Sequence, residues 1–315
     1  MSLLRVSKSE PCPICNHPDW CSVSDDDKIA ICMRVADGSV RETQNGGFIH
    51  ALSNQGRTSQ RKPASKSSAT VAPIERRDVV YTALLESLKL NGRDADDLLR
   101  RGLSDTEIAR NLYASLPDTS QQILNTCRIL AERHDLAGVP GFYRDYESRP
   151  MFVTWRSGYL IPVRDAQGKI QGCQIRQNGG SRYIWFSSPD HYEGTSSGSP
   201  VHFARPWRCV LIGEAIITEG ALKADIIAEH LDAGVVAVAG VSSFRDGFGD
   251  WLRAQLPALQ TVMLAFDCDW QVKPEVECAM LRLMASVEKA GLAGGLLDWS
   301  EAKGLDDLLT MEVAV

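Results

Sequence analysis

The spacing of hydrophobic and polar residues changes along the chain, and the last third has the most regular pattern. From about Trp207 onward, short apolar runs alternate with segments in which apolar residues recur at helical spacing. The predicted strands are 215–218, 235–239, 261–266 and 295–299, and the predicted helices are 221–231, 248–256 and 275–290. This alternation predicts a mostly parallel α/β sheet with helices on its faces.

The middle of the chain combines a helical pattern with a strand pattern. In residues 78–134, apolar side chains such as Val80 and Leu84 repeat at helical spacing, and Ser104 with Glu107 has the spacing of a capping box. Beyond about Met151 the pattern becomes that of a half-buried sheet. The strands predicted there are 158–164, 169–176 and 182–187.

The first 77 residues divide into a compact segment and a segment of linker composition. Residues 1–52 contain a predicted hairpin, with strands at 20–24 and 28–35, and a further apolar stretch at 48–52. Residues 53–77 have almost no large apolar side chains, which is typical of a flexible linker. The basic residues of this segment are Arg57, Arg61, Lys62, Lys66, Arg76 and Arg77. It is predicted to be a solvated tether, which could also contact phosphates nonspecifically.

Composition and net charge limit the kinds of partner that the chain is expected to bind. Apolar residues make up 44% of the 315-residue chain, enough for a sizeable core, and the formal net charge is −6. A nucleic-acid partner would therefore require local basic patches. No apolar run reaches the length of a membrane span, and the N-terminus has no apolar signal core. We expect a cytoplasmic protein with reduced thiols and no membrane partner.

Four of the nine cysteines cluster near the N-terminus and predict a structural zinc site. Cys12 and Cys15 form a tight knuckle, and Cys21 and Cys32 complete a set of four thiolates. His17 lies in the same loop and could replace Cys15 or Cys21. A module of this size has little core, so bound metal would supply folding energy. The other thiols are predicted to be ordinary buried side chains: Cys127, Cys173, Cys209, Cys268 and Cys278.

Acidic residues follow three of the predicted strands in the last third. Glu219 follows the first strand, and Asp267 and Asp269 follow the third. Asp306 and Asp307 come after the last strand. Because ligands of open α/β sheets bind at the carboxyl ends of strands, these acids are expected to converge. Grouped carboxylates favour Mg²⁺ or Mn²⁺, which can activate an attacking oxygen and stabilise a leaving phosphate.

The order of these acids resembles the Toprim domain over residues 207–315. The resemblance implies that Glu219 is a general acid or base and that Asp267 and Asp269 bind metal. The family often has an aspartate at the fifth position of the motif that begins with the glutamate, whereas this chain has Lys223 there and Asp225 two residues later. Lys223 could therefore contact a phosphate or be a surface lysine.

The whole chain resembles the bacterial and phage DNA primases, and especially the short primase-like proteins of phages, plasmids and mobile elements. The resemblance implies a multidomain α+β fold: a zinc ribbon (1–52), a linker (53–77), a mixed helical and β basic subdomain (78–206) and an α/β Toprim domain (207–315). By position in the basic subdomain, Arg176 and Arg182 would lie near template and nucleotide. Single-stranded DNA and nucleoside triphosphates are the implied partners.

Two alternatives remain open at the level of sequence. A Toprim domain also suits a metal-dependent nuclease, and a zinc module with a Toprim domain could be a non-enzymatic adaptor that binds single strands and recruits a helicase. The sequence has no phosphate-binding loop of a helicase motor, so a primase of this kind would depend on a separate helicase. The aromatic residues Tyr183, Trp185 and Phe186 could stack on bases or belong to the core.

Overall fold

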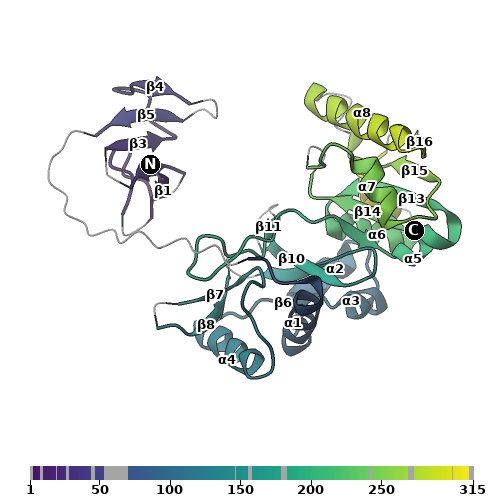
Figure 1. Cartoon of the computed structure of the whole chain (residues 1–315), viewed down its shortest axis with the longest axis horizontal. Coiled ribbons are helices and arrows are strands. Elements are labelled where there is room, and N and C mark those ends of the chain that lie inside the picture. Colours follow the sequence, from purple (N-terminus) through teal and green to yellow (C-terminus); the bar gives the residue numbers. More distant parts are fainter. Residues whose placement is uncertain are drawn as a thin grey trace. The chain divides into compact units, whose positions relative to one another are not determined.

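The structure is a computed structural model of the whole chain, in which two compact units are distinguished, Met1–Ser65 and Lys66–Val315. Each unit is described by itself (Figure 1). The described residues are 3–7, 10–18, 20–25, 28–43, 47–52, 70–145, 147–154, 158–178, 183–240, 243–268, 273–299 and 301–311.

The first unit is a small antiparallel sheet. Its described strands lie in the order β1 (Leu3–Arg5), β2 (Ser22–Ser24), β3 (Ile29–Cys32), β5 (Phe48–Ala51) and β4 (Arg41–Glu42). The predicted hairpin is confirmed, because β2 and β3 pair antiparallel, and the apolar stretch at 48–52 forms the next strand. Its core contains Val6, Val23 and Ala30 beside cysteine side chains.

Helices dominate the start of the second unit, as the periodicity predicted. They are α1 (Ile74–Ser87), α2 (Gly92–Arg100), α3 (Asp105–Asn111) and α4 (Ser120–Ala131). Helix α1 begins inside the segment predicted to be linker. The capping box predicted at Ser104 forms only in part: the Ser104 hydroxyl accepts the Glu107 N–H at 3.2 Å, but the Glu107 carboxylate binds the Arg205 guanidinium at 2.6 Å.

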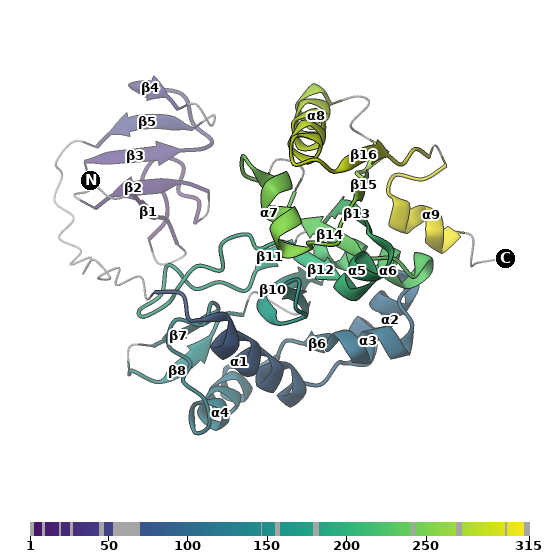
Figure 2. The same ribbon diagram turned by 45° about the vertical axis from the view of Figure 1, so that its right-hand side comes forward.

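The predicted strands of the middle segment form an antiparallel sheet. Its order is β11 (Tyr183–Trp185), β10 (Ile170–Gln177), β9 (Gly158–Arg164) and β6 (Ala114–Ser115), and a separate hairpin consists of β7 (Phe142–Arg144) and β8 (Pro150–Phe152). Helices α1 and α4 pack against these strands (Figures 1 and 2). Phe186 is fully buried beside Tyr81, Phe142 and Phe152. Base stacking by Phe186 is therefore excluded by its burial.

The C-terminal sheet has the α/β architecture that the alternation predicted. Its described strands lie in the order β12 (His202–Ala204), β14 (Val235–Val238), β13 (Glu214–Glu219), β15 (Thr261–Leu264) and β16 (Ala293–Leu296). All neighbouring pairs are parallel except β12 with β14. Strand β12 was not predicted, and it precedes the boundary predicted at residue 207.

Helices cover both faces of this sheet. They are α5 (Pro206–Ile212), α6 (Ala221–Leu231), α7 (Phe248–Gln255), α8 (Pro274–Lys289) and α9 (Leu305–Met311). One face packs Ala215 and Ile217 of β13 against α7 and α8, and the other packs Val235 and Ala237 of β14 against α6 and α9 (Figure 2). Among the described residues, none of the helices has both the length and the apolar character needed to cross a membrane.

Candidate active site

Three of the predicted acidic residues come together at the carboxyl edge of the C-terminal sheet. Glu219 ends β13, and Asp267 follows the adjacent parallel strand β15, so both lie at the same edge. Asp306 enters from the first turn of α9. The ammonium of Lys223 links them: its Nζ hydrogen-bonds Asp267 and lies 3.9 Å from both Glu219 Oε1 and Asp306 Oδ1.

Two lysines neutralise Asp267, which is only 5% exposed. Lys303, a residue not predicted as part of the site, places its Nζ 2.9 Å from Asp267 Oδ2. Burial by itself raises the pKa of Asp267, but the two ammonium groups lower it below its ordinary value. For Lys223, burial lowers the pKa, and the charges of Asp306, Asp267 and Glu219 raise it further than burial lowers it. Both groups are therefore charged at neutral pH.

Asp306 has unused capacity to accept a hydrogen bond or a cation. It is 9% exposed, and its Oδ1 is buried without a hydrogen-bond partner. Burial raises the pKa of this carboxyl above its ordinary value. Gly304 is packed against it: a Cβ at Gly304 would stand 2.4 Å from Asp306 Oδ1 and 3.0 Å from Asp267 Oδ1. The close approach of these carboxylates therefore depends on a residue without a side chain.

The donor types suit a hard divalent cation, but their oxygens are spaced around the Lys223 ammonium: among the described residues, only the four N-terminal cysteines have ligand atoms all within 4.8 Å of one another. Glu219, Asp267 and Asp306 offer carboxylate oxygens, the ligand type that Mg²⁺ and Mn²⁺ prefer. Asp307, also predicted as a ligand, is exposed and accepts the Gly304 N–H at 3.3 Å, so it fixes the loop before α9. Asp269 lies outside the described residues.

A basic pocket of about 180 Å³ adjoins the end of β10. Arg176 lines it together with Gln177 and Asn178 and with the α2 residues Arg93, Asp97 and Arg100. Arg176 and Tyr183 are partners across β10 and β11, and the guanidinium lies 4.9 Å from the centre of the tyrosine ring. Tyr183 is 42% exposed, whereas Trp185 is half-buried against the core. Arg182 lies outside the described residues.

Asp97, the carboxylate among the described residues that line this pocket, already has partners. Asp97 Oδ2 accepts from Arg101 Nε at 2.9 Å and from the Tyr159 hydroxyl at 3.0 Å, and its Oδ1 accepts from Arg100 Nη2 at 3.1 Å. Burial raises the pKa of Asp97, but Arg101 above all lowers it below its ordinary value. Arg100 and Arg101 both pair with this single negative charge, and Arg93 and Arg176 add two further positive charges, so the pocket is positive, as an anion site requires. Sequence reasoning missed Arg93 and Arg100, although their seven-residue spacing places them on one face of a helix.

A buried polar network joins the C-terminal sheet to the segment after α3. Asp225 on α6 accepts a hydrogen bond from the Tyr113 hydroxyl at 2.5 Å and one from His202 Nε2 at 3.1 Å. His202 Nδ1 accepts the Arg164 backbone N–H, so the proton of the neutral ring is on Nε2. Burial and then the charge of Asp225 raise the pKa of Tyr113 well above its ordinary value. The network anchors the helix that carries Lys223.

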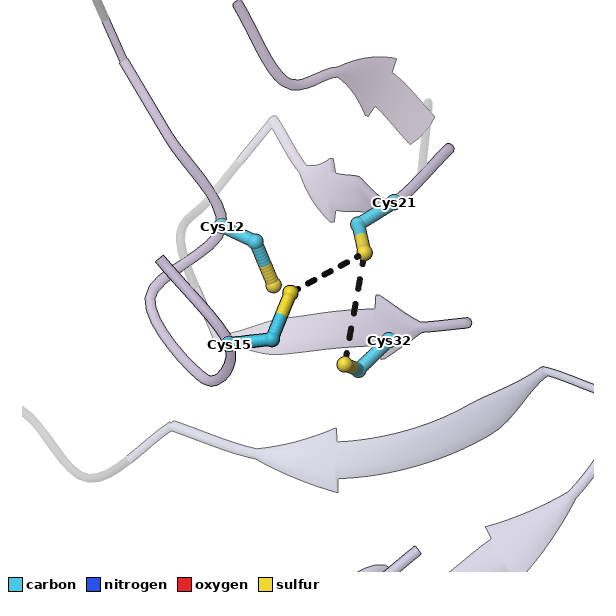
Figure 3. A group of neighbouring side chains, drawn as sticks. All are labelled: Cys12, Cys15, Cys21 and Cys32. Atoms are coloured by element: carbon cyan, nitrogen blue, oxygen red, sulfur yellow. Dashed lines mark hydrogen bonds between the residues drawn. The ribbon is translucent and has the colours of Figure 1, made fainter. Parts of the chain in front are cut away.

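The four N-terminal cysteines converge on one point (Figure 3). All the sulfur atoms of Cys12, Cys15, Cys21 and Cys32 lie within 4.8 Å of one another, and Cys21 Sγ is 3.6 Å from Cys15 Sγ and 4.0 Å from Cys32 Sγ. Tetrahedral zinc with bonds of about 2.3 Å would place the sulfurs about 3.8 Å apart, so the set fits zinc. The exposed His17 is not part of this cluster.

Backbone N–H groups favour the thiolate form of the cysteines, whereas burial opposes it. The backbone N–H groups of Met33 and Val35 point at Cys21 and Cys32, each at 3.4 Å. Burial nevertheless raises the pKa of Cys21 to about 12. Burial also acts to raise the pKa of Cys15, but the His17 N–H and neighbouring thiols lower it to about 7. A metal ion would therefore have to displace at least the proton of Cys21.

Comparisons with known proteins agree with this architecture. Residues 207–314 match the family described as "Domain of unknown function (DUF3854)". None of the curated proteins matches the chain by sequence. Among solved structures, the zinc-binding and RNA polymerase domains of the Aquifex aeolicus primase are similar, with a TM-score of 0.58 and 16% identity, over 99% of this chain and 79% of that one.

Two further solved structures resemble the chain. The RNA polymerase domain of the Mycobacterium tuberculosis primase DnaG has a TM-score of 0.57 and 13% identity, over 74% of this chain and 78% of that one. A DnaG primase catalytic domain bound to single-stranded DNA has a TM-score of 0.56 and 17% identity, over 76% and 75%. At these identities the likeness establishes a shared fold, that of bacterial primase zinc-binding and polymerase domains.

Proposed function

We propose that the protein is a DNA primase, which synthesises short primers on a single-stranded template by metal-dependent nucleotidyl transfer. The observation that carries the proposal is the meeting of Glu219, Asp267 and Asp306 at one edge of a parallel sheet. The primase-like fold, together with these acidic residues at the edge of the C-terminal sheet, supports a Toprim assignment for that sheet. A fold can host several chemistries, so the proposal rests on the site.

In the proposed reaction, the 3′-hydroxyl oxygen of the primer bonds to the α-phosphorus of a nucleoside triphosphate. The bond from that phosphorus to its bridging oxygen breaks, and pyrophosphate leaves. Glu219 takes the hydroxyl proton, because it is the most exposed of the three acids, with 32% of its side chain accessible. Asp267 and Asp306, with Asp269 from the sequence resemblance, would hold Mg²⁺ or Mn²⁺, and the bound ion would supply positive charge to stabilise the phosphates.

The basic pocket provides the second part of the proposal. Arg93, Arg100 and Arg176 surround it, and the exposed ring of Tyr183 lies beside Arg176. Guanidinium groups bind phosphate oxygens in a bidentate manner, and an exposed tyrosine can stack on an unpaired base. We assign this pocket, with Arg182, to template or nucleotide phosphates. One similar solved structure is a primase catalytic domain bound to single-stranded DNA.

We also propose a structural zinc site, a helicase partner and a biological setting. The Cys12, Cys15, Cys21 and Cys32 set holds structural zinc in the first unit. A helicase is proposed as partner, and replication of a phage, plasmid or other mobile element as the setting, on the sequence resemblance described above.

The test is primer synthesis on single-stranded DNA with labelled nucleotides and Mg²⁺ or Mn²⁺, comparing the wild type with Glu219→Gln. The wild type should extend primers, and the variant should bind the template normally and make at least about 100-fold less product, the usual contribution of a general base. Glu86→Gln, an exposed residue on α1, is the matched control for loss of one carboxylate. Degradation of the template without primer extension would make the protein a nuclease instead. Template binding without either reaction would indicate the non-enzymatic adaptor.

A further inference from the structure

The acidic site contains a cation of its own. Lys223 projects from the first turn of α6, four residues after Glu219, and only 26% of its side chain is exposed. Its ammonium hydrogen-bonds Asp267 and lies 3.9 Å from Glu219 and from Asp306. These are the same carboxylates that would ligate a divalent ion.

The packing around the ammonium restricts it to this position. A Cβ at Gly304 would stand 3.3 Å from Lys223 Nζ, so the loop before α9 approaches the lysine closely. Two residues further along α6, Asp225 is held in the buried network with Tyr113 and His202, which fixes the helix. The ammonium is thus a built part of the site and differs from a flexible lysine on the surface.

We propose that Lys223 is the resident counter-ion of the acidic site and competes with the divalent cation for its carboxylates. The inference rests on the metal site of the proposed function and adds to it a residue that sets metal affinity. Massed carboxylates repel one another unless cations neutralise them, and here Lys223 lies among all three acids while Lys303 also pairs with Asp267. A divalent ion that binds the same carboxylate oxygens must displace the ammonium of Lys223. Otherwise its binding is weakened by electrostatic repulsion from that ammonium.

The competition has two measurable consequences. Removing the charge of Lys223 leaves the carboxylates with more net negative charge, so the site should bind a divalent ion more tightly. We expect the Kd for Mn²⁺ to fall at least about tenfold, a conservative value for unit charges about 4 Å apart in a partly buried site. Because the variant should bind Mn²⁺ more tightly, a given concentration of Mn²⁺ should raise its melting temperature by more than it raises that of the wild type.

The experiment is calorimetric titration of the full zinc-loaded chain with Mn²⁺, without DNA or nucleotide. Lys223→Met removes the charge, and Lys223→Gln removes it while keeping a hydrogen-bond donor for Asp267, should the first variant fold poorly. Lys223→Arg keeps the charge and should stay near the wild-type Kd. Lys169→Met is the matched control, because Lys169 pairs with Glu75 at 3.1 Å on the exposed side of α1.

Tighter Mn²⁺ binding by Lys223→Met or Lys223→Gln, with unchanged binding by Lys169→Met, supports the inference. Unchanged or weaker binding by a folded, uncharged variant overturns it, as does the absence of Mn²⁺ binding in every variant. The outcome is separate from primer synthesis. A protein that makes no primers but shows the tenfold change would refute the proposed function and leave the role of Lys223 standing.

Discussion

Replacing Tyr113 with phenylalanine is the sharpest test of how the second unit is held together. Tyr113 is 5% exposed, and its hydroxyl donates to Asp225 Oδ2 at 2.5 Å. The other oxygen of Asp225 accepts from His202, so both carboxylate oxygens are used. Phenylalanine keeps the ring, including its edge-on contact with Tyr159, and removes only the donor.

The expected loss of stability follows from the carboxylate that accepts the hydrogen bond and from the burial of that bond. A hydrogen bond to a charged group contributes about 1.5–3 kcal/mol, and here its loss leaves a buried carboxylate oxygen without that partner. For a unit of this size, about 2–4 °C of melting temperature corresponds to 1 kcal/mol, so Tyr113→Phe should lower the melting temperature of the second unit by roughly 3–12 °C. Asp225→Asn should cost at least as much, because His202 then faces an amide.

The assay is differential scanning calorimetry of the full chain, with Tyr192→Phe as the matched control. Tyr192 is 48% exposed, so removing its hydroxyl should change the melting temperature by less than about 1 °C. If Tyr113→Phe melts as the control does, the network contributes nothing to stability. The idea that it anchors α6 would then be wrong.

Two further outcomes are expected. Cys21→Ser should reduce bound zinc from about one ion per chain to a small fraction of it, because a closed structural site needs all four ligands. Metal analysis of the purified protein measures this. Full retention of zinc would contradict the four-cysteine set. Arg100→Ala should weaken single-stranded DNA or nucleotide binding and reduce the slope of log K against log salt by about 0.7 if a single-strand phosphate contact is lost. In fluorescence titrations Arg282→Ala, an exposed arginine on α8, should behave as the wild type, and an unchanged slope for Arg100→Ala would remove that residue from the binding surface.

Local pattern was sufficient to predict much of the fold. The bounds of β9 and α6 agree with their predicted ranges, because strand alternation and helical periodicity are properties of neighbouring residues. The placement of Glu219 and Asp267 at one edge also followed from sequence. Both residues come directly after predicted strands, at 215–218 and 261–266, that the βαβ rule makes parallel neighbours or near neighbours. The cysteine spacing identified the four sulfurs that converge in the structure.

Contacts between distant segments had to come from the tertiary structure. The three-residue strand β12 is too short to produce a periodic signal, and only its pairing with β14 makes it part of the sheet. Tyr183 and Phe186 are three residues apart, so strand alternation puts their rings on opposite faces, but which face joins the core depends on the distant residues Tyr81, Phe142 and Phe152. From the sequence alone, Lys223 could be either a surface lysine or a phosphate contact. Its place among three carboxylates depends on loops that lie up to 83 residues away along the chain, which no local pattern encodes.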